Sequence, residues 1–212
     1  RERVDAALRT LPGEGHVALV ADVSTPSGAT SFIEAAADAL GAPPDILVAN
    51  AGGPPPGTFS STPLEAYAEA LDLNLLSVVA MCKAAVPAMQ ERRWGRVVAI
   101  TSIAVRQPIR TLILSNTARA GATGFLKTLA TEVARDGVTV NSVLPGSHAT
   151  DRLIAIHGGE EGAARAAQAV PAGVLGDPAD FGSVVAFLCS EHARFITGAA
   201  LQIDGGQYAG LL

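Results

Sequence analysis

Residues 45–57 read DILVANAGGPPPG, an apolar run that ends in a turn of glycine and proline. A short, continuous apolar run bounded by turn residues is typical of a strand buried on both faces of a parallel sheet. Within this stretch we expect the strand to be Asp45–Ala49. Similar runs occur at His16–Ala21 (HVALVA), Arg96–Thr101 (RVVAIT), Val138–Leu144 (VTVNSVL) and Ala200–Ile203 (ALQI). We expect all five runs to be strands.

Helical patterns rich in alanine and leucine separate these runs. They are predicted at Arg1–Leu11, Ser27–Leu40, Pro63–Arg92, Asn116–Arg135 and Ala179–Ser190, the third with a bend near Asp72. Strands that alternate with helices indicate a parallel sheet covered on both faces. The predicted fold is therefore α/β, a doubly wound parallel sheet of Rossmann type, as a single domain over residues 1–212. The less regular segment 147–176 suits a substrate lid.

The beginning of the chain departs from the usual order of such a sheet. No G-x-G-x-x-G turn follows any predicted strand, and Gly13 and Gly15 lie in a helix-to-strand loop. If 16–21 is strand 3 and 45–49 is strand 4 of a 3-2-1-4-5-6 sheet, strands 1 and 2 are missing between them. We therefore expect the N-terminal glycine-rich βαβ portion to be absent from this chain and the parent polypeptide to be longer at its N-terminus.

Composition narrows the class of protein. The net charge of −5 argues against a nucleic-acid partner, because phosphate neutralisation needs clustered Lys and Arg. No run approaches the ~20 apolar residues of a membrane span, and no signal peptide is visible. Cys82 and Cys189 lie in apolar helical stretches, which favours core residues in a reducing compartment over a disulfide or metal site. We expect a cytoplasmic protein without a metal, since His16, His157 and His192 lack metal-ligand spacing.

Polar and glycine residues follow the predicted strands at the edge where a dinucleotide lies in such a sheet. Asp22-Val23 comes after the first strand and Asn50-Ala51-Gly52-Gly53 after the second. Asp22 could accept from an adenine amino group while the Val23 backbone frames the ring, and the glycines let the main chain approach ribose and pyrophosphate. Each motif alone also fits an Asx-turn or a tight turn. Two in register favour a cofactor site.

These motifs resemble the DV and NNAG motifs of the short-chain dehydrogenase/reductase family, with Ala49 in place of the first Asn. The resemblance continues in family order over the whole chain. It implies that Asn74 holds a water of a proton relay and that Ser102 hydrogen-bonds the substrate carbonyl. It also implies that Pro145-Gly146 faces the nicotinamide and that Thr150 contacts the carboxamide and diphosphate. The C-terminal motif Asp204-Gly205-Gly206 is interpreted as turn or interface structure.

The family's Tyr-x-x-x-Lys motif is replaced. Thirteen residues after Ser102, where the family has its tyrosine, the chain has Ser115, and four further it has Arg119 instead of lysine. A serine hydroxyl is shorter and much less acidic than a phenol, whose reference pKa is about 10. Arg119 can bind ribose hydroxyls and supply positive charge, but it cannot give up a proton. Loss of general acid–base help costs about 10²–10⁴-fold in rate and leaves the contribution of orientation.

Leu112–Arg119 (LILSNTAR) and Asn50–Gly57 (NAGGPPPG) resemble an atypical subgroup of the family with L-x-L-S-N-x-x-R. Its members are commonly labelled 3-oxoacyl-acyl-carrier-protein reductases or oxidoreductases. The resemblance implies an NADP- or NAD-dependent enzyme that interconverts a carbonyl and a secondary alcohol, with acyl thioesters among its substrates, and a homo-oligomer, expected to be a tetramer. The alternative is a dinucleotide-binding or scaffold protein without dehydrogenase activity.

Three further residues are weaker candidates. His148, two residues before Thr150, could be a substitute acid, although a histidine in a lid is more often solvated. Arg106 and Arg110 could face an anionic substrate or a carrier-protein phosphate, with solvation in a loop as the default.

Overall fold

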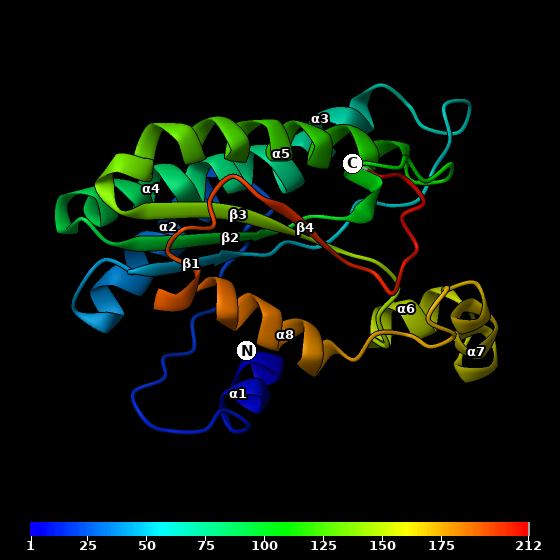
Figure 1. The fold of residues 1–212 in the computed structure, drawn as a ribbon, viewed down its shortest axis with the longest axis horizontal. Coiled ribbons are helices and arrows are strands. Elements are labelled where there is room, and N and C mark those ends of the chain that lie inside the picture. Colours follow the sequence, from blue (N-terminus) through cyan, green and yellow to red (C-terminus); the bar gives the residue numbers. More distant parts are fainter. Residues whose placement is uncertain (212) are drawn as a thin grey trace.

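Four strands form one parallel sheet in chain order (Figure 1). The computed structural model describes residues 1–211, apart from the side chain of residue 3. The strands are β1 (Ile46–Ala49), β2 (Gly95–Ile100), β3 (Val138–Pro145) and β4 (Ala200–Ile203). Ala49 lies opposite Ala99, and Ile100 lies opposite Val143, so the carboxyl ends of the strands meet at one edge of the sheet.

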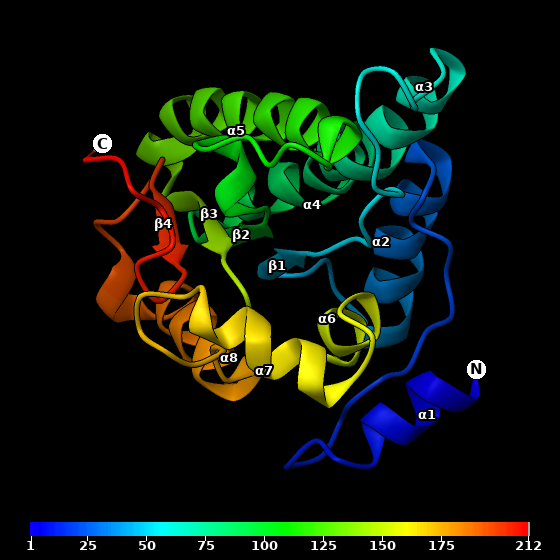
Figure 2. The same cartoon turned by 90° about the vertical axis from the view of Figure 1, so that its right-hand side faces the viewer.

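Helices cover the two faces of the sheet. On one face, α2 (Pro26–Leu40), α4 (Ser77–Arg92) and α5 (Ile113–Val133) enclose the larger apolar core, while α8 (Pro178–Leu188) closes a smaller core on the other (Figures 1 and 2). This is the predicted doubly wound α/β arrangement. The remaining helices are α1 (Glu2–Leu8), α3 (Glu65–Leu71), α6 (Asp151–Ile156) and α7 (Glu160–Gln168), with single turns at Ile103–Val105, Ala134–Asp136 and Glu191–Ala193.

The predicted strand at His16–Ala21 is wrong. Residues 16–21 have no strand structure, and Val17 and Val20 are 46% and 61% exposed. A strand is held by hydrogen bonds to a neighbouring strand, and among the described residues none pairs with this segment. The sheet therefore begins at β1, where Ile46 and Val48 are nearly half exposed.

The predicted bend near Asp72 is a π-helical turn, η1 (Asp72–Leu76), between α3 and α4. The continuous helical segment Glu65–Arg92 is long and apolar enough, by length and composition, to cross a membrane. The expectation that no segment has the length and apolar composition of a membrane span is therefore wrong. Met81, Cys82 and Met89 of this segment are buried in the larger core, and packing against the sheet accounts for its apolar composition.

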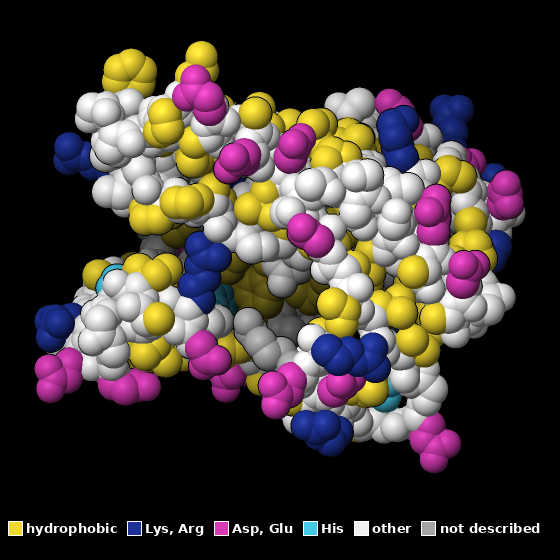
Figure 3. All heavy atoms as spheres, turned by 180° about the vertical axis from the view of Figure 1, so that it is seen from behind, with side chains coloured by type: hydrophobic (Ala, Val, Ile, Leu, Met, Phe, Trp, Pro, Cys, Tyr) yellow, Lys and Arg dark blue, Asp and Glu magenta, His cyan; other side chains and the backbone are white. Residues whose placement is uncertain are grey.

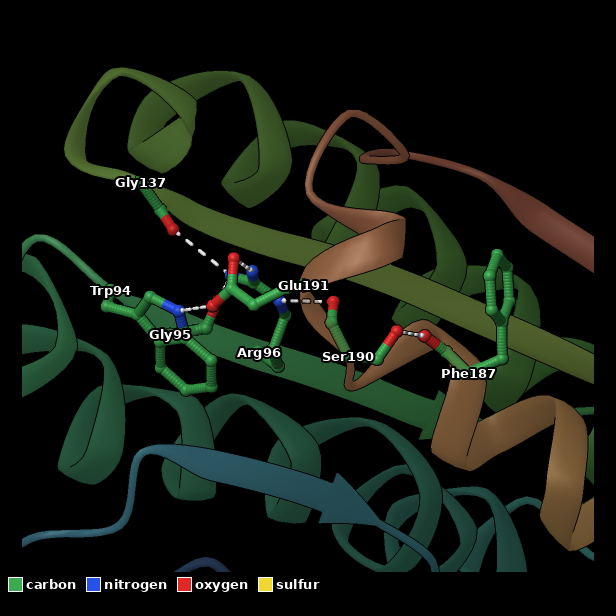
Figure 4. Close-up of polar contacts among 7 residues, drawn as sticks. All are labelled: Trp94, Gly95, Arg96, Gly137, Phe187, Ser190 and Glu191. Carbon is green, nitrogen blue, oxygen red and sulfur yellow. Dashed lines mark hydrogen bonds and ion pairs between the residues drawn. The ribbon is translucent and has the colours of Figure 1, made fainter.

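A buried cation lies at the opposite end of the sheet, near the start of β2 (Figure 4). Arg96 is 2% exposed, and its guanidinium donates to the carbonyls of Gly95 (2.9 Å) and Gly137 (3.3 Å). Its Nε donates to the Ser190 carbonyl at 3.4 Å, and Nη2 lies 3.6 Å from the Glu191 carboxylate. These contacts join β2 to the turn before β3 and to the segment after α8.

The segment 147–176 holds α6 and α7, which lie together beyond the carboxyl edge of the sheet (Figures 1 and 2). A bridge between His148 and Gly176 joins its two ends. The Ala149 amide donates to the Gly176 carbonyl at 2.9 Å, and the Gly176 amide donates to the Ser147 carbonyl at 3.0 Å. The segment therefore has a closed base from which its two helices project.

Candidate active site

A cavity of about 610 Å³ lies at the carboxyl edge of the sheet, under α6. Seen from behind, the molecule is notched between the end that holds α3 and the end that holds α6 and α7, with hydrophobic side chains along the walls (Figure 3). The volume falls within the range of about 300–1,000 Å³ typical of ligand pockets. Its lining consists of Asn50–Gly53, Ile100–Ser102, Ser115, Arg119, Pro145, Gly146, His148, Thr150, Arg152, Leu153, Ile156 and His157.

Most of the predicted site residues meet in this lining. Those that do are Asn50, Ala51, Gly52, Ser102, Ser115, Arg119, Pro145, Gly146 and Thr150. They come from the ends of three strands, one helix and the start of α6. The doubly wound topology brings them together, because strand carboxyl ends share one edge.

Ser102 follows β2 directly, with an extended backbone. Its hydroxyl oxygen accepts a hydrogen bond from the Ala104 amide at 3.1 Å and so caps the turn Ile103–Val105. A serine hydroxyl has one hydrogen to donate in addition to its acceptor sites. The cap therefore fixes the position of the Ser102 hydroxyl and leaves its hydrogen for a ligand in the cavity.

Ser115 lies in the first turn of α5 and is 8% exposed. In the described part of the chain its hydroxyl has no hydrogen-bond partner, although it lines the cavity. The neighbouring Asn116 holds the preceding loop, since its side chain donates to the Ile109 carbonyl at 2.9 Å and accepts from the Ile109 amide at 3.3 Å. The start of α5 is thus fixed while Ser115 remains available.

Arg119 lies one turn beyond Ser115 and joins the ends of β1 and β2. Its Nη1 donates to the Ile100 carbonyl at 2.8 Å, and its Nη2 donates to the carbonyls of Gly52 (3.3 Å) and Ala51 (3.5 Å). Burial, and to a smaller extent the charge of Arg152, lowers the pKa of Arg119 to about 10. The guanidinium is still a cation at neutral pH.

Asn74 lies in the π-helical turn, behind the cavity lining, and is 2% exposed. Its Nδ2 donates to the Gly52 carbonyl at 2.8 Å, which holds the turn after β1. The Oδ1 atom of the same amide is buried without a hydrogen-bond partner in the described structure. Buried polar atoms are nearly always paired with protein or water. The orphaned oxygen therefore marks a place for a polar partner outside the protein chain.

Gly146 lines the cavity directly after the end of β3. A Cβ at this position would lie 2.3 Å from Gln207 Oε1 and 2.8 Å from Asp204 Cα, so only glycine fits against the C-terminal turn. Asp204 makes that turn, since its carboxylate accepts from the amides of Gly206 (2.9 Å) and Tyr208 (2.8 Å). The DGG motif is turn structure, as predicted.

Thr150 and His148 lie where the chain enters α6. Thr150 caps the helix, accepting from the Leu153 amide at 3.3 Å. His148 is 9% exposed, with Nδ1 3.2 Å from the Gly146 carbonyl and its ring edge-on to Phe181 at 5.0 Å. Since a carbonyl can only accept, Nδ1 is the donor in this contact. His148 is thus a packed residue of the cavity wall and is not a solvated one.

Besides Asn74, four predicted residues lie outside the lining. Asp22 accepts from the Ser24 amide at 2.9 Å in an Asx-turn, and the hydrogen bonding holds the pKa of its carboxyl below the usual value. Val23 packs against the larger core. Arg106 donates to the Ala200 carbonyl at 3.1 Å and lies over the Tyr208 ring, so the weaker of its two interpretations, that it faces an anionic substrate, gains no support from this cavity. Arg110 is exposed and also lies outside the lining.

Arg152 is a residue of the site that the sequence did not reveal. It lies in the first turn of α6, and its Nη2 donates to the Gly53 carbonyl at 3.3 Å. Leu153 and Ile156 of the same helix supply apolar lining. The sequence offers one indication of this role, which is that Arg152 lies two residues after Thr150, a predicted site residue.

Comparisons with known proteins agree with this geometry. Residues 1–207 match the family described as enoyl-(acyl carrier protein) reductase. The chain is 36% identical to 3-oxoacyl-acyl-carrier-protein reductase FabG of Vibrio cholerae over 196 residues, which is 92% of this chain and 79% of the relative. It is 37% identical to the FabG protein of Escherichia coli over 190 residues, 90% of this chain and 77% of that protein.

Solved structures resemble the fold closely. L-sorbose reductase of Gluconobacter frateurii, complexed with NADPH and L-sorbose, has a TM-score of 0.93 at 29% identity. The match covers 100% of this chain and 85% of that protein's chain. A short-chain oxidoreductase of Pseudomonas aeruginosa PAO1, bound to NADPH and described as containing an atypical catalytic center, has a TM-score of 0.88 at 30% identity over 99% of this chain and 84% of its own. With the sheet, the strand-end motifs and these relatives in agreement, the chain belongs to the short-chain dehydrogenase/reductase family.

Proposed function

We propose that this protein is an NADP(H)- or NAD(H)-dependent oxidoreductase that interconverts a carbonyl and a secondary alcohol at an atypical active site. The observation that carries the proposal is the convergence of two serine hydroxyls, Ser102 and Ser115, and the cation Arg119 on one cavity at the carboxyl edge of the sheet. Reduction of 3-oxoacyl thioesters is the substrate class suggested by the FabG relatives.

The cavity fits the nicotinamide half of a dinucleotide. A Cβ added at Gly52 would meet no atom within 4 Å, which leaves open space beside the end of β1, and the orphaned Oδ1 of Asn74 lies behind this turn. Asn50, Ala51, Gly52, Pro145, Gly146, Thr150 and Arg119 would hold the group. When bound, the reduced nicotinamide supplies two electrons and one hydrogen to the substrate carbon. The similar solved structures support a nicotinamide dinucleotide as the ligand, since two of them are described with NADPH.

In this proposal the residues of the chain act on the substrate oxygen. Ser102 and Ser115 donate hydrogen bonds to it, and the positive charge of Arg119 favours the negative charge that develops there. Because neither serine nor arginine is an effective acid at neutral pH, the single proton that the substrate oxygen takes up comes from water through the Ser115 hydroxyl. Asn74 would keep that water in place with its unpartnered Oδ1. We further propose that segment 147–176 acts as a lid. The cytoplasmic location stays a prediction from the composition, and the homo-oligomer stays a prediction of the resemblance.

A titration followed by an activity assay tests the proposal. The protein is titrated with NADPH and with NADH by fluorescence and is then assayed for oxidation of the preferred cofactor with aldehydes, ketones and 3-oxoacyl thioesters. The proposal predicts saturable binding and turnover with at least one carbonyl class. Saturable binding without turnover on any of them would favour the alternative, a dinucleotide-binding or scaffold protein without dehydrogenase activity.

A further inference from the structure

The charged side chains that line the cavity are all positive. Arg119 and Arg152 both contribute a positive charge, whereas the lining contains no Asp or Glu among the described residues. The chain as a whole carries a net charge of −5, so the excess of basic groups is a local feature. A concave site lined by one sign of charge attracts ligands of the opposite sign.

The two arginines differ in how much of their hydrogen-bonding capacity the protein uses. Arg119 donates to three backbone carbonyls, at the ends of two strands. Arg152 donates only to the Gly53 carbonyl, at 3.3 Å, among the described contacts. A guanidinium carries five N–H donors in a planar fork. Most of the Arg152 fork is therefore available to a ligand.

Neither arginine is neutralised within the described structure. The ion pairs of the described residues are Arg1–Asp5, Arg92–Asp45, Arg93–Asp136 and Arg96–Glu191. Arg152 instead acts on Arg119 as a like charge, since its repulsion contributes to the lowered pKa of Arg119. An anion bound beside Arg152 would relieve this repulsion as well as satisfy the free donors.

Arg152 links segment 147–176, the proposed lid, to the carboxyl edge of the sheet. The side chain extends from the first turn of α6 to the turn after β1, and that turn carries a glycine where the guanidinium arrives. A Cβ at Gly53 would lie 3.0 Å from Arg152 Nη2, so the absence of a side chain makes room for the contact. Next to the charge, Leu153 and Ile156 offer an apolar wall.

We propose that Arg152 is a specificity-determining residue that binds an anionic group carried by the carbonyl substrate, a carboxylate or a phosphate, with the apolar wall of α6 beside its carbon chain. The inference rests on the proposed function, because it assigns a substrate class to the same cavity. The other source of an anion is the diphosphate of the cofactor, and the experiment separates the two.

The test compares substrates that differ only in the anion. The pairs are acetoacetate with methyl acetoacetate, and dihydroxyacetone phosphate with dihydroxyacetone, each assayed for kcat and KM with saturating cofactor. Charge-assisted, bidentate hydrogen bonds predict about a 10- to 100-fold preference in kcat/KM for the anionic member of at least one pair. Arg152→Gln should abolish that preference, because it lowers kcat/KM for the anionic member far more than for the neutral one.

Three further variants sharpen the result. Arg152→Lys keeps the charge without the planar fork and should restore part of the preference. Gly53→Ala places a Cβ against Nη2 and should weaken the anionic member selectively. Arg165→Gln is the matched control, since Arg165 is an exposed arginine of α7 outside the lining. It should leave both members unchanged.

Two outcomes would overturn the inference. One is equal kcat/KM for both members of each pair in the wild type. The other is an Arg152→Gln variant that weakens NADPH binding and lowers both members alike, because the anion at Arg152 would then be the cofactor diphosphate.

A binding measurement keeps this inference separate from the proposed function. Calorimetric titration with 3-hydroxybutyrate and with its methyl ester, in the presence of NADP⁺, needs no turnover. If no carbonyl is reduced but the acid binds at least tenfold more tightly than the ester in the wild type and not in Arg152→Gln, the anion site stands and the proposed activity fails. Turnover without any such difference in binding would show that the anion site is wrong and would leave the proposed function standing.

Discussion

Asn74 shows how one residue can combine a structural contact with an unused polar atom. Its Nδ2 holds the Gly52 carbonyl, while its Oδ1 is buried without a partner in the described structure. Burial of an unpaired amide oxygen costs free energy. A side chain selected for stability alone would avoid that cost, which points to a role for Oδ1 toward a bound water or ligand.

Replacement of Asn74 by alanine should therefore affect activity more than stability. We expect Asn74→Ala to lower kcat by about 10²-fold, the lower end of the loss expected when general acid–base help is removed. The free energy of unfolding should change by only about 1 kcal/mol, because the lost hydrogen bond is offset by removal of the orphaned oxygen. Steady-state kinetics and urea unfolding of the same preparation measure both quantities.

Ser77 provides a matched control for Asn74. It lies directly after the π-helical turn, is fully buried and donates to the Leu73 carbonyl at 2.6 Å, but it does not line the cavity. Ser77→Ala should change stability without a comparable loss of kcat. If Asn74→Ala kept the wild-type kcat, the role assigned to its Oδ1 would be wrong.

At the scale of elements, Arg96 joins β2 to the turn before β3 and to the segment after α8 (Figure 4). The ion pair with Glu191 is unequal, since Arg96 is 2% exposed and Glu191 is 61% exposed. Screening by water makes an exposed carboxylate a weak contributor. The three backbone carbonyls and the Trp94 ring, whose centroid lies 4.4 Å from the guanidinium carbon, therefore account for most of what Arg96 stabilises.

This inequality predicts different costs for the two partners. Arg96→Ala should lower the free energy of unfolding by about 2–4 kcal/mol, because it leaves a buried space and carbonyls without donors. Glu191→Gln should cost less than about 1 kcal/mol. Urea unfolding of both variants checks the comparison, and equal losses would mean that the ion pair itself dominates.

The segment 16–21 shows where strand prediction depends on more than local pattern. Its apolar run resembles that of β1, yet β1 pairs with β2 over four residues and 16–21 pairs with no strand among the described residues. A strand needs a partner, and an apolar run alone does not supply one. Asp22 and Val23 follow this unpaired segment, and neither reaches the cavity lining.

Across the whole molecule, the two cysteines lie on opposite faces of the sheet and differ in how deeply they are buried. Cys82 lies in the larger core at 1% exposure, and burial raises its pKa to about 12. Cys189 packs beside the smaller core, is only partly buried and also has a raised pKa. Thiol reagents react with the exposed thiolate.

A thiol-labelling experiment tests this difference. At pH 8 the native protein should react with Ellman's reagent at Cys189, slowly, while Cys82 stays unreactive until urea unfolds the chain. Because the raised pKa keeps Cys82 protonated well above pH 9, the protection should persist at pH 9. The Cys189→Ser variant should then show no reaction before unfolding. Rapid labelling of Cys82 in that variant would contradict the arrangement of the core.

The architecture and most of the site could be predicted because both follow from a regular topology. Ser102, Arg119 and Gly146 are distant in sequence, but each is tied to the carboxyl end of a strand or to the helix beside it, and these ends share one edge. The position of Arg152 depends instead on how an irregular segment folds over that edge, and Arg106 turns away to Tyr208. No local pattern fixes either of these side chains.

In the proposed reaction Ser102, assisted by Ser115, polarises the substrate oxygen. The most direct test is kcat of Ser102→Ala and Ser115→Ala with the best carbonyl found, after equal cofactor binding has been verified for both variants. We expect Ser102→Ala to abolish measurable turnover, because removal of a hydrogen-bond donor to the developing oxyanion costs up to about 10³-fold. Ser115→Ala should only weaken turnover, by about 10²-fold, the lower end of the contribution of a proton-transfer group. Equal turnover of wild type and Ser102→Ala would contradict the claim.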